Sequence, residues 1–209
     1  MADGNYVTNA AVNTEPVGLA VGAQISSLVD HDLPLSNIHL IGHSLGAHVV
    51  GYAARALKNT YQKTLKRITG LDPAFPSFYP DGVLMEHIRA TDAQFVDIIH
   101  TDAGGYGAPV STGTADFWPN GGTALQPGCP AALPLTDSSY CSHWRSWRYY
   151  AESVRYPKAF LSWPATSYLM FKLTPKPQKG MVYMGYNCSS SSKGNYYLTT
   201  NSASPFGQN

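Results

Sequence analysis

The sequence predicts an α/β fold in which a parallel sheet carries crossover helices. Short apolar strands are expected at residues 38–41, 67–71 and 95–100, and stretches with helical spacing separate the first two. Strands that alternate with helices indicate parallel pairing, because each crossover returns the chain to the same end of the sheet. At 209 residues, the chain is long enough for one domain of this class with a sizeable core.

The first half of the chain shows where its elements begin and end. Residues 16–30 place apolar side chains at helical spacing, and Pro34 breaks that pattern before the first strand. The helix after this strand is expected to run to about Asn59. The second strand ends at Pro73, which cannot continue a central strand.

The second half is less periodic. Residues 103–140 are rich in Gly, Pro, Ser and Thr and predict a long loop, which in a compact domain is usually functional. Residues 144–154 return to helical spacing, with an apolar side formed by Trp144, Trp147, Ala151 and Val154. Residues 181–186 and 195–200 predict two strands joined by a turn, which would make a terminal β-hairpin.

Charge and hydropathy exclude several classes of partner. The formal net charge is +1, from 14 basic and 13 acidic residues spread along the chain, so no basic patch predicts binding to nucleic acid. No apolar run is long enough to predict a transmembrane segment. The first residues show neither a basic n-region nor an apolar h-region, so we expect no export signal in the chain as written.

Three cysteines are too few for a disulfide scaffold and have no metal-site spacing, so no metal site is predicted. Cys129 and Cys141 bracket a loop rich in Pro and Ser, and a disulfide between them would close it in an oxidising compartment. Cys188 is then left without a partner that the sequence identifies.

A Gly-x-Ser-x-Gly pattern at residues 42–46 is the strongest local signal. A predicted strand precedes it and a predicted helix follows, which is the context of a nucleophile elbow. Gly42 and Gly46 would let the flanking backbone approach a strained serine closely. Ser44 is therefore the candidate nucleophile.

A serine hydroxyl needs a histidine to take its proton and an acid to orient that histidine. In an elbow fold, these groups follow in the order Ser, acid, His. Asp72 is the first acid at the end of a strand after Ser44, whereas Asp97 lies within a strand and is better explained as a hydrogen-bonded structural acid. The later histidines are His87, His100 and His143, among which order and context favour His143 only modestly.

Five ordered segments form a further pattern, at residues 42–48, 68–74, 95–102, 116–122 and 141–146. Together they closely resemble the pancreatic lipase family, particularly its insect phospholipase A1-like and lipase member H-like proteins. The resemblance implies an α/β-hydrolase fold, of which the chain would hold the C-terminal portion of the parallel sheet. It also implies one partial catalytic domain over residues 1–209, truncated at its N-terminus and without a separate C-terminal lipid-binding domain.

The resemblance places the catalytic triad on Ser44, Asp72 and His143. The backbone N–H of Leu45 would be one oxyanion donor, and the second would come from an upstream loop that we expect to be absent from this chain. The paired cysteines would be Cys129 and Cys141, and the family context implies secretion.

The implied activity is hydrolysis of lipid esters at a membrane or emulsion surface, without a cofactor. In the family, the loop between the paired cysteines acts as a lid and a second loop helps to hold acyl chains. Both loops are short here, at residues 130–140 and 103–115, which favours phospholipase A1 over triacylglycerol lipase. The alternative from another class is an inactive lipase-like lipid-binding protein of the yolk type. Asp92 matches one position of the family's calcium segment, but Arg89 stands where another acid is expected, so calcium is not predicted.

Overall fold

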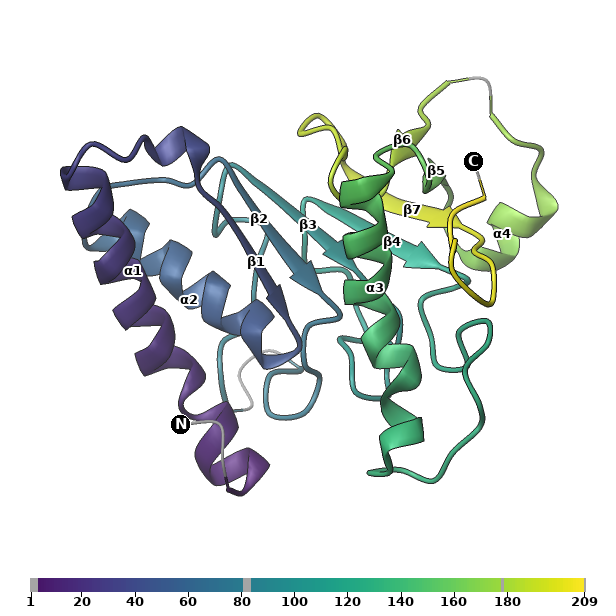
Figure 1. The fold of residues 1–209 in the computed structure, drawn as a ribbon, viewed down its shortest axis with the longest axis horizontal. Helices are drawn as coiled ribbons and strands as arrows, with labels where there is room; N and C mark the ends of the chain where they lie inside the picture. Colours follow the sequence, from purple (N-terminus) through teal and green to yellow (C-terminus); the bar gives the residue numbers. More distant parts are fainter. Residues whose placement is uncertain (1–3, 81–83, 178, 209) are drawn as a thin grey trace.

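The computed structural model describes residues 4–80, 84–177 and 179–208, which form a mostly parallel sheet with helices on both faces (Figure 1). The sheet has seven strands in the order β1-β2-β3-β4-β7-β5-β6. Neighbouring strands from β1 to β7 in this order are parallel, and β5 is antiparallel to both β7 and β6. The strands are β1 (His39–His43), β2 (Arg67–Leu71), β3 (Phe95–Ile99), β4 (Ala115–Pro119), β5 (Leu161–Pro164), β6 (Val182–Tyr183) and β7 (Gly194–Leu198).

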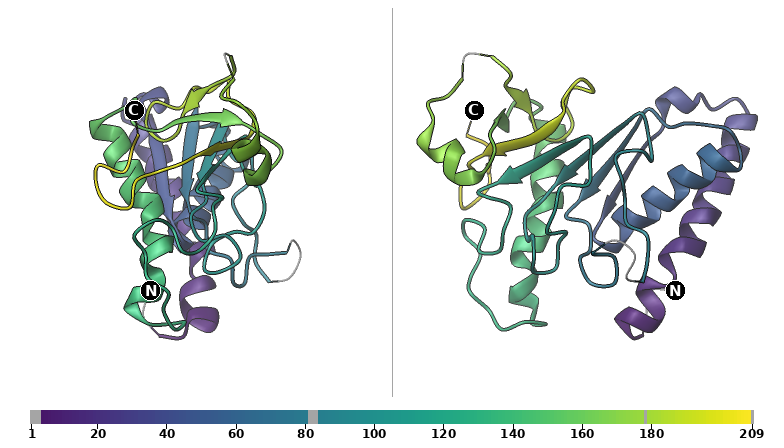
Figure 2. Two further views of the ribbon diagram at one scale, coloured as in Figure 1. Left: turned by 90° about the vertical axis from the view of Figure 1, so that its right-hand side faces the viewer. Right: turned by 180° about the vertical axis from the view of Figure 1, so that it is seen from behind.

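The helices lie on opposite faces of this sheet. Figures 1 and 2 show α1 and α2 side by side behind the β1 end, and α3 across the other face. The helices are α1 (Thr14–Asp30), α2 (Leu45–Asn59), α3 (Cys141–Arg155) and α4 (Tyr168–Leu173), with short helical turns η1 (Tyr6–Ala11), η2 (Leu35–Asn37) and η3 (Asp137–Tyr140). None of the helices in the described residues is both long and apolar enough to cross a bilayer.

Alternation along the strands explains why both faces can be covered. In β3, Val96 and Ile98 face a cluster with Leu57 of α2, whereas Phe95 and Ile99 pack with Tyr149 of α3. Every residue of β3 is buried, as expected for a strand with helices on both sides. The expected α/β fold, the three strands and the helices over residues 16–30 and up to Asn59 are confirmed.

The predicted terminal β-hairpin is wrong. The chain segments at residues 181–186 and 195–200 contain β6 and β7, but β5 lies between these two strands. Trp163 and Pro164 of β5 are the partners of Tyr197 and Tyr196. β6 and β7 follow each other in the sequence but do not pair, because β5, from further upstream, occupies the position between them.

Two further expectations need correction. The predicted loop at residues 103–140 contains β4, whose residues are all buried between β3 and β7. On α3, the supposed apolar side is exposed, with 41% of Trp147 and 49% of Val154 accessible. The helix instead buries its side with His143, Ser146, Tyr149, Tyr150 and Ser153. Ser146 and Ser153 hydrogen-bond the carbonyls of His143 and Tyr150, which satisfies their hydroxyls inside the core.

Candidate active site

Ser44 stands at the sharp turn between β1 and α2. Its φ of 57° and ψ of −123° are unusual for a residue with a side chain, and its N–H donates to the carbonyl of Leu71 at 3.0 Å. A Cβ on Gly42 would collide with the carbonyl of Gly46, so the close approach expected at Gly42 is confirmed. At Gly46 a Cβ would meet open space, and the expected steric need for this glycine is wrong.

Asp72 follows β2 directly, beside the end of β3. Its N–H donates to the carbonyl of Ile99 at 2.7 Å, and its φ of 45° is again positive. The side chain is fully buried, and its Oδ1 accepts hydrogen bonds from the backbone N–H groups of Thr101 at 2.8 Å and Asp102 at 3.1 Å. Two backbone donors at the end of β3 therefore fix the orientation of this carboxylate.

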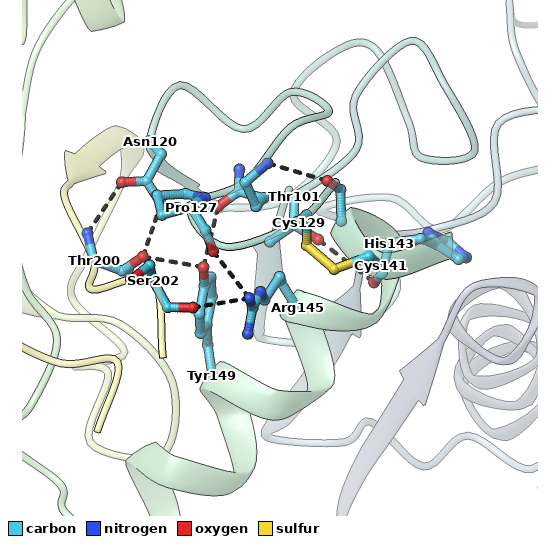
Figure 3. The surroundings of a disulfide bond; sticks show 12 residues. Thr101, Asn120, Pro127, Cys129, Cys141, His143, Arg145, Tyr149, Thr200 and Ser202 are labelled. Atoms are coloured by element: carbon cyan, nitrogen blue, oxygen red, sulfur yellow. Dashed lines mark hydrogen bonds between the residues drawn. A yellow bond between two sulfur atoms is a disulfide. The ribbon is translucent and has the colours of Figure 1, made fainter. Parts of the chain in front are cut away.

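His143 lies in the first turn of α3, which begins three residues before the helical spacing expected from residue 144. Its Nδ1 donates to Oδ2 of Asp72 at 2.6 Å, which leaves Nε2 unprotonated and able to take a proton in the neutral ring. The predicted disulfide between Cys129 and Cys141 is confirmed and ties the start of α3 to the preceding loop (Figure 3). The histidine is thus placed by a helix, a disulfide and a buried carboxylate.

The backbone carbonyl of His143 is held as well. It accepts hydrogen bonds from Nε2 of His43 at 3.2 Å and from the hydroxyl of Ser146 at 2.9 Å. Burial and the neighbouring His143 lower the pKa of His43 to about 4, so this ring is neutral at physiological pH. The elbow and α3 are therefore joined directly by His43.

Ser44 and His143 open into one groove of about 690 Å³ at the carboxyl ends of the strands. Its walls combine the N-terminal turn η1, the elbow, the segment after β2 and the loop before α3. Its lining residues include Tyr6, Leu45, Tyr106, Leu135, Tyr140 and Trp144. Asp72 lies behind His143, so the structure brings the three predicted residues to one place.

Leu45 is the first residue of α2, where a helix leaves its backbone N–H groups without intrahelical partners. The start of this helix also carries partial positive charge, which favours a developing anion. The backbone N–H of Leu45 is thus suitably located to stabilise an oxyanion formed at Ser44.

The competing residues have other partners. Nε2 of His100 contacts Oδ1 of Asp116 at 2.8 Å, and the His100 ring stacks on Trp118. Asp97 forms a buried two-point ion pair with Arg67 at 2.7 and 2.8 Å, as expected for a structural acid. These contacts favour structural roles for both residues.

The side chains that could hold a metal ion already have other partners, within the part of the chain that the structure describes. Ligand atoms of Asp72, Asp102 and His143 lie within 4.8 Å of one another, but Nδ1 of His143 already serves Asp72. Asp92, which matches a calcium position in the resemblance, binds Arg55 at 2.8 Å instead.

Several contributors to the site were not predicted from the sequence. The sequence did contain a signal for the backbone donors of Thr101 and Asp102, because both residues follow the predicted strand at residues 95–100. No sequence pattern indicates that Tyr6 belongs to the site. Its hydroxyl donates to the carbonyl of Pro76 at 3.0 Å, which joins η1 to the groove wall. Tyr106 lies within the predicted loop, where no periodic pattern indicates its position.

Comparison with known proteins decides the family. The family model described as Lipase matches residues 2–206. The chain belongs to the Lipase family. The mostly parallel sheet with helices on both faces is accordingly the α/β-hydrolase fold of this family.

Three relatives illustrate the range within the Lipase family. Inactive pancreatic lipase-related protein 1 of Homo sapiens is 38% identical, over 95% of this chain and 47% of that protein. Pancreatic triacylglycerol lipase of Sus scrofa is 37% identical, over 95% of this chain and 49% of that protein. Lipase member H-A of Xenopus laevis is 39% identical, over 79% of this chain and 35% of that protein. The chain thus spans less than half of each of these relatives.

Proposed function

We propose that the protein hydrolyses carboxylic esters of lipids through an acyl-enzyme. The observation that carries this proposal is the buried contact of 2.6 Å between His143 and Asp72, beside Ser44 in the same groove. Membership of the Lipase family supports the lipid substrate class. In domain terms, residues 1–209 are proposed to be one partial lipase catalytic domain.

In this mechanism, Oγ of Ser44 attacks the ester carbonyl while Nε2 of His143 takes its proton. Asp72 stabilises the imidazolium that forms, and the Leu45 N–H stabilises the oxyanion. Collapse of the tetrahedral intermediate releases the alcohol, which receives the proton from His143. Water then attacks the acyl-enzyme by the same route and frees the fatty acid and Ser44.

For the substrate, we favour phospholipase A1 activity, with hydrolysis of the sn-1 ester of a phospholipid. The disulfide loop supports this choice, because only 12 positions separate Cys129 from Cys141 and a short loop leaves room for a polar head group. Triacylglycerol hydrolysis is the alternative, and a relative with that name is 37% identical. Fatty acid release from phosphatidylcholine vesicles that exceeds release from a triglyceride emulsion supports our choice, and the reverse order contradicts it.

A second candidate function is lipid binding without catalysis. It is favoured by one observation, the relative named as inactive at 38% identity. Wild-type protein and a Ser44→Ala variant should be compared on p-nitrophenyl butyrate and on lipid vesicles. Ester hydrolysis that disappears with Ser44→Ala supports the enzyme, whereas equal vesicle binding without any hydrolysis supports the binding protein.

We also propose that the protein is secreted and acts at a membrane or emulsion surface. The disulfide supports this location, since such bonds persist in oxidising compartments. Isolation of the natural protein from its source, with free thiols trapped during extraction, tests it directly: the protein should lie outside the cells with its disulfide formed. Protein confined to the cytosol with reduced Cys129 and Cys141 would contradict it.

A further inference from the structure

Tyr106 lines the groove but takes no part in the proposed steps of ester hydrolysis. It lies between β3 and β4, and its backbone is anchored at both polar groups. Its carbonyl accepts the N–H of Phe75 at 2.8 Å, and its N–H donates to Oδ2 of Asp102 at 3.3 Å. The half-buried ring therefore extends from a fixed point close to Asp72.

The hydroxyl of Tyr106 joins two points of the loop between Cys129 and Cys141, which we call the disulfide loop (residues 130–140). The N–H of Leu135 donates to this hydroxyl at 2.8 Å. The hydroxyl of Ser139 donates to the carbonyl of Thr136 at 2.7 Å, so it accepts the Tyr106 proton across 2.8 Å. Tyr106 thus uses its single proton and one acceptor position in a continuous chain of hydrogen bonds.

The ring of Tyr106 also touches the other side of the site. It stacks on Tyr140 with centroids 4.4 Å apart, and its centroid is 5.9 Å from that of His143. One side chain therefore contacts both the disulfide loop and the histidine of the proposed triad.

Leu135 shows why the loop needs such a contact. Its φ is 66°, a left-handed conformation that costs free energy for a residue with a Cβ and persists only when neighbours hold it. Its side chain is 79% exposed and lines the groove, so burial of that side chain does not hold it. The hydrogen bond to Tyr106 fixes the backbone at this position.

We propose that Tyr106 is a positioning residue whose hydroxyl fastens the disulfide loop and fixes Leu135 at the rim of the groove. The inference rests on the proposed ester hydrolysis and concerns the binding of the acyl chain. A fixed apolar rim is already ordered before the substrate arrives, so binding does not have to order the loop. The contact between His143 and Asp72 is independent of the hydroxyl, so the chemical step is unaffected.

The variant Tyr106→Phe keeps the ring and removes both hydrogen bonds of the hydroxyl. On p-nitrophenyl butyrate we expect KM to rise about fivefold, the effect of losing roughly one neutral hydrogen bond's net contribution. The value of kcat should stay within about twofold, because no contact made only in the transition state is lost. Ser139→Ala should raise KM in the same direction, and the double variant should add little to Tyr106→Phe. Tyr61→Phe, an exposed tyrosine after α2, is the matched control and should change neither constant.

Limited proteolysis gives a readout that needs no activity. Cleavage in the disulfide loop, seen as new fragments after reduction, should be faster in Tyr106→Phe than in wild type or Tyr61→Phe. Unchanged cleavage overturns the fastening role, and faster cleavage with an unchanged KM overturns the role in substrate binding. A fall in kcat at constant KM also overturns it, since Tyr106 would then act on His143. If wild type neither turns over ester nor reacts with a fluorophosphonate at Ser44, the proposed hydrolysis fails, whereas the proteolysis still tests the fastening.

Discussion

Replacement of Asp72 with asparagine changes one oxygen of a buried carboxylate into an amide nitrogen, and the structure indicates which oxygen. Oδ1 accepts two backbone N–H groups, from Thr101 and Asp102, so the amide oxygen must remain on that side. The NH₂ group then faces Nδ1 of His143, where Oδ2 stood at 2.6 Å. An amide donor there forces the histidine proton onto Nε2, and the ring can no longer accept the proton of Ser44.

The expected cost is that of a histidine held in the wrong tautomer, a loss of about 10⁴ in kcat. This factor corresponds to about 5.4 kcal/mol of transition-state stabilisation. The fold should be little affected, because the two backbone hydrogen bonds to Oδ1 survive. Initial rates on p-nitrophenyl butyrate and thermal unfolding of the same preparation measure both quantities.

Asp97→Asn is the matched control, since Asp97 is also a fully buried acid and lies in β3, beside the strand that Asp72 follows. It breaks the ion pair with Arg67, which should lower the free energy of unfolding by about 3 kcal/mol while folded protein keeps its kcat. If Asp72→Asn retained more than about a tenth of the wild-type kcat, Asp72 could not be the acid that orients His143.

Other predictions concern the elbow, a buried acid and the free thiol. Gly42→Ala should abolish soluble folded protein or activity, whereas Gly46→Ala should remain folded, and a tolerated Gly42→Ala would contradict the elbow geometry. Burial, and then the charge of Asp72, raise the pKa of Asp102 from 3.8 to about 6, so its charged form destabilises the folded state increasingly as pH rises from 4 to 6. The free energy of unfolding of Asp102→Asn should therefore exceed that of wild type by an amount that grows across this range, to about 1 to 2 kcal/mol above pH 6 after allowance for solvent screening. Urea unfolding at several pH values measures this difference, and a difference independent of pH would refute the prediction. Burial raises the pKa of the Cys188 thiol to about 12, so a disulfide reagent should titrate no thiol in the native protein and one after unfolding, and a native thiol that reacts at once would contradict the buried position.

Periodic segments account for what the sequence predicted of the fold. The first three strands and the helices α1 and α2 were predicted because their apolar spacing is regular. Pro34, Gly42 and Pro73 also mark where α1, β1 and β2 give way to the next segment. The second half was harder, since β4 is a five-residue strand inside a stretch rich in Gly, Pro and Ser. On α3, the sequence could not show that small serines and tyrosines, rather than Trp147 and Val154, face the core.

The candidate site was predictable where chemistry follows topology. Ser44 and Asp72 follow neighbouring parallel strands, so their placement at the same edge of the sheet came from the fold. The contact of His143 with Asp72 was anticipated from chain order and resemblance. Their catalytic roles stay a prediction. The contribution of Tyr106 was not predictable, because its hydrogen bonds depend on the conformation of a loop that no repeating pattern determines.

Labelling by a fluorophosphonate tests most directly the central claim that His143 and Asp72 activate Ser44. Mass spectrometry of the treated protein should show one adduct, on the peptide that contains Ser44. The adduct should be absent from Ser44→Ala and strongly reduced in His143→Ala, although both variants should be folded. Folded wild-type protein without an adduct, or equal labelling of Ser44→Ala, would contradict the claim.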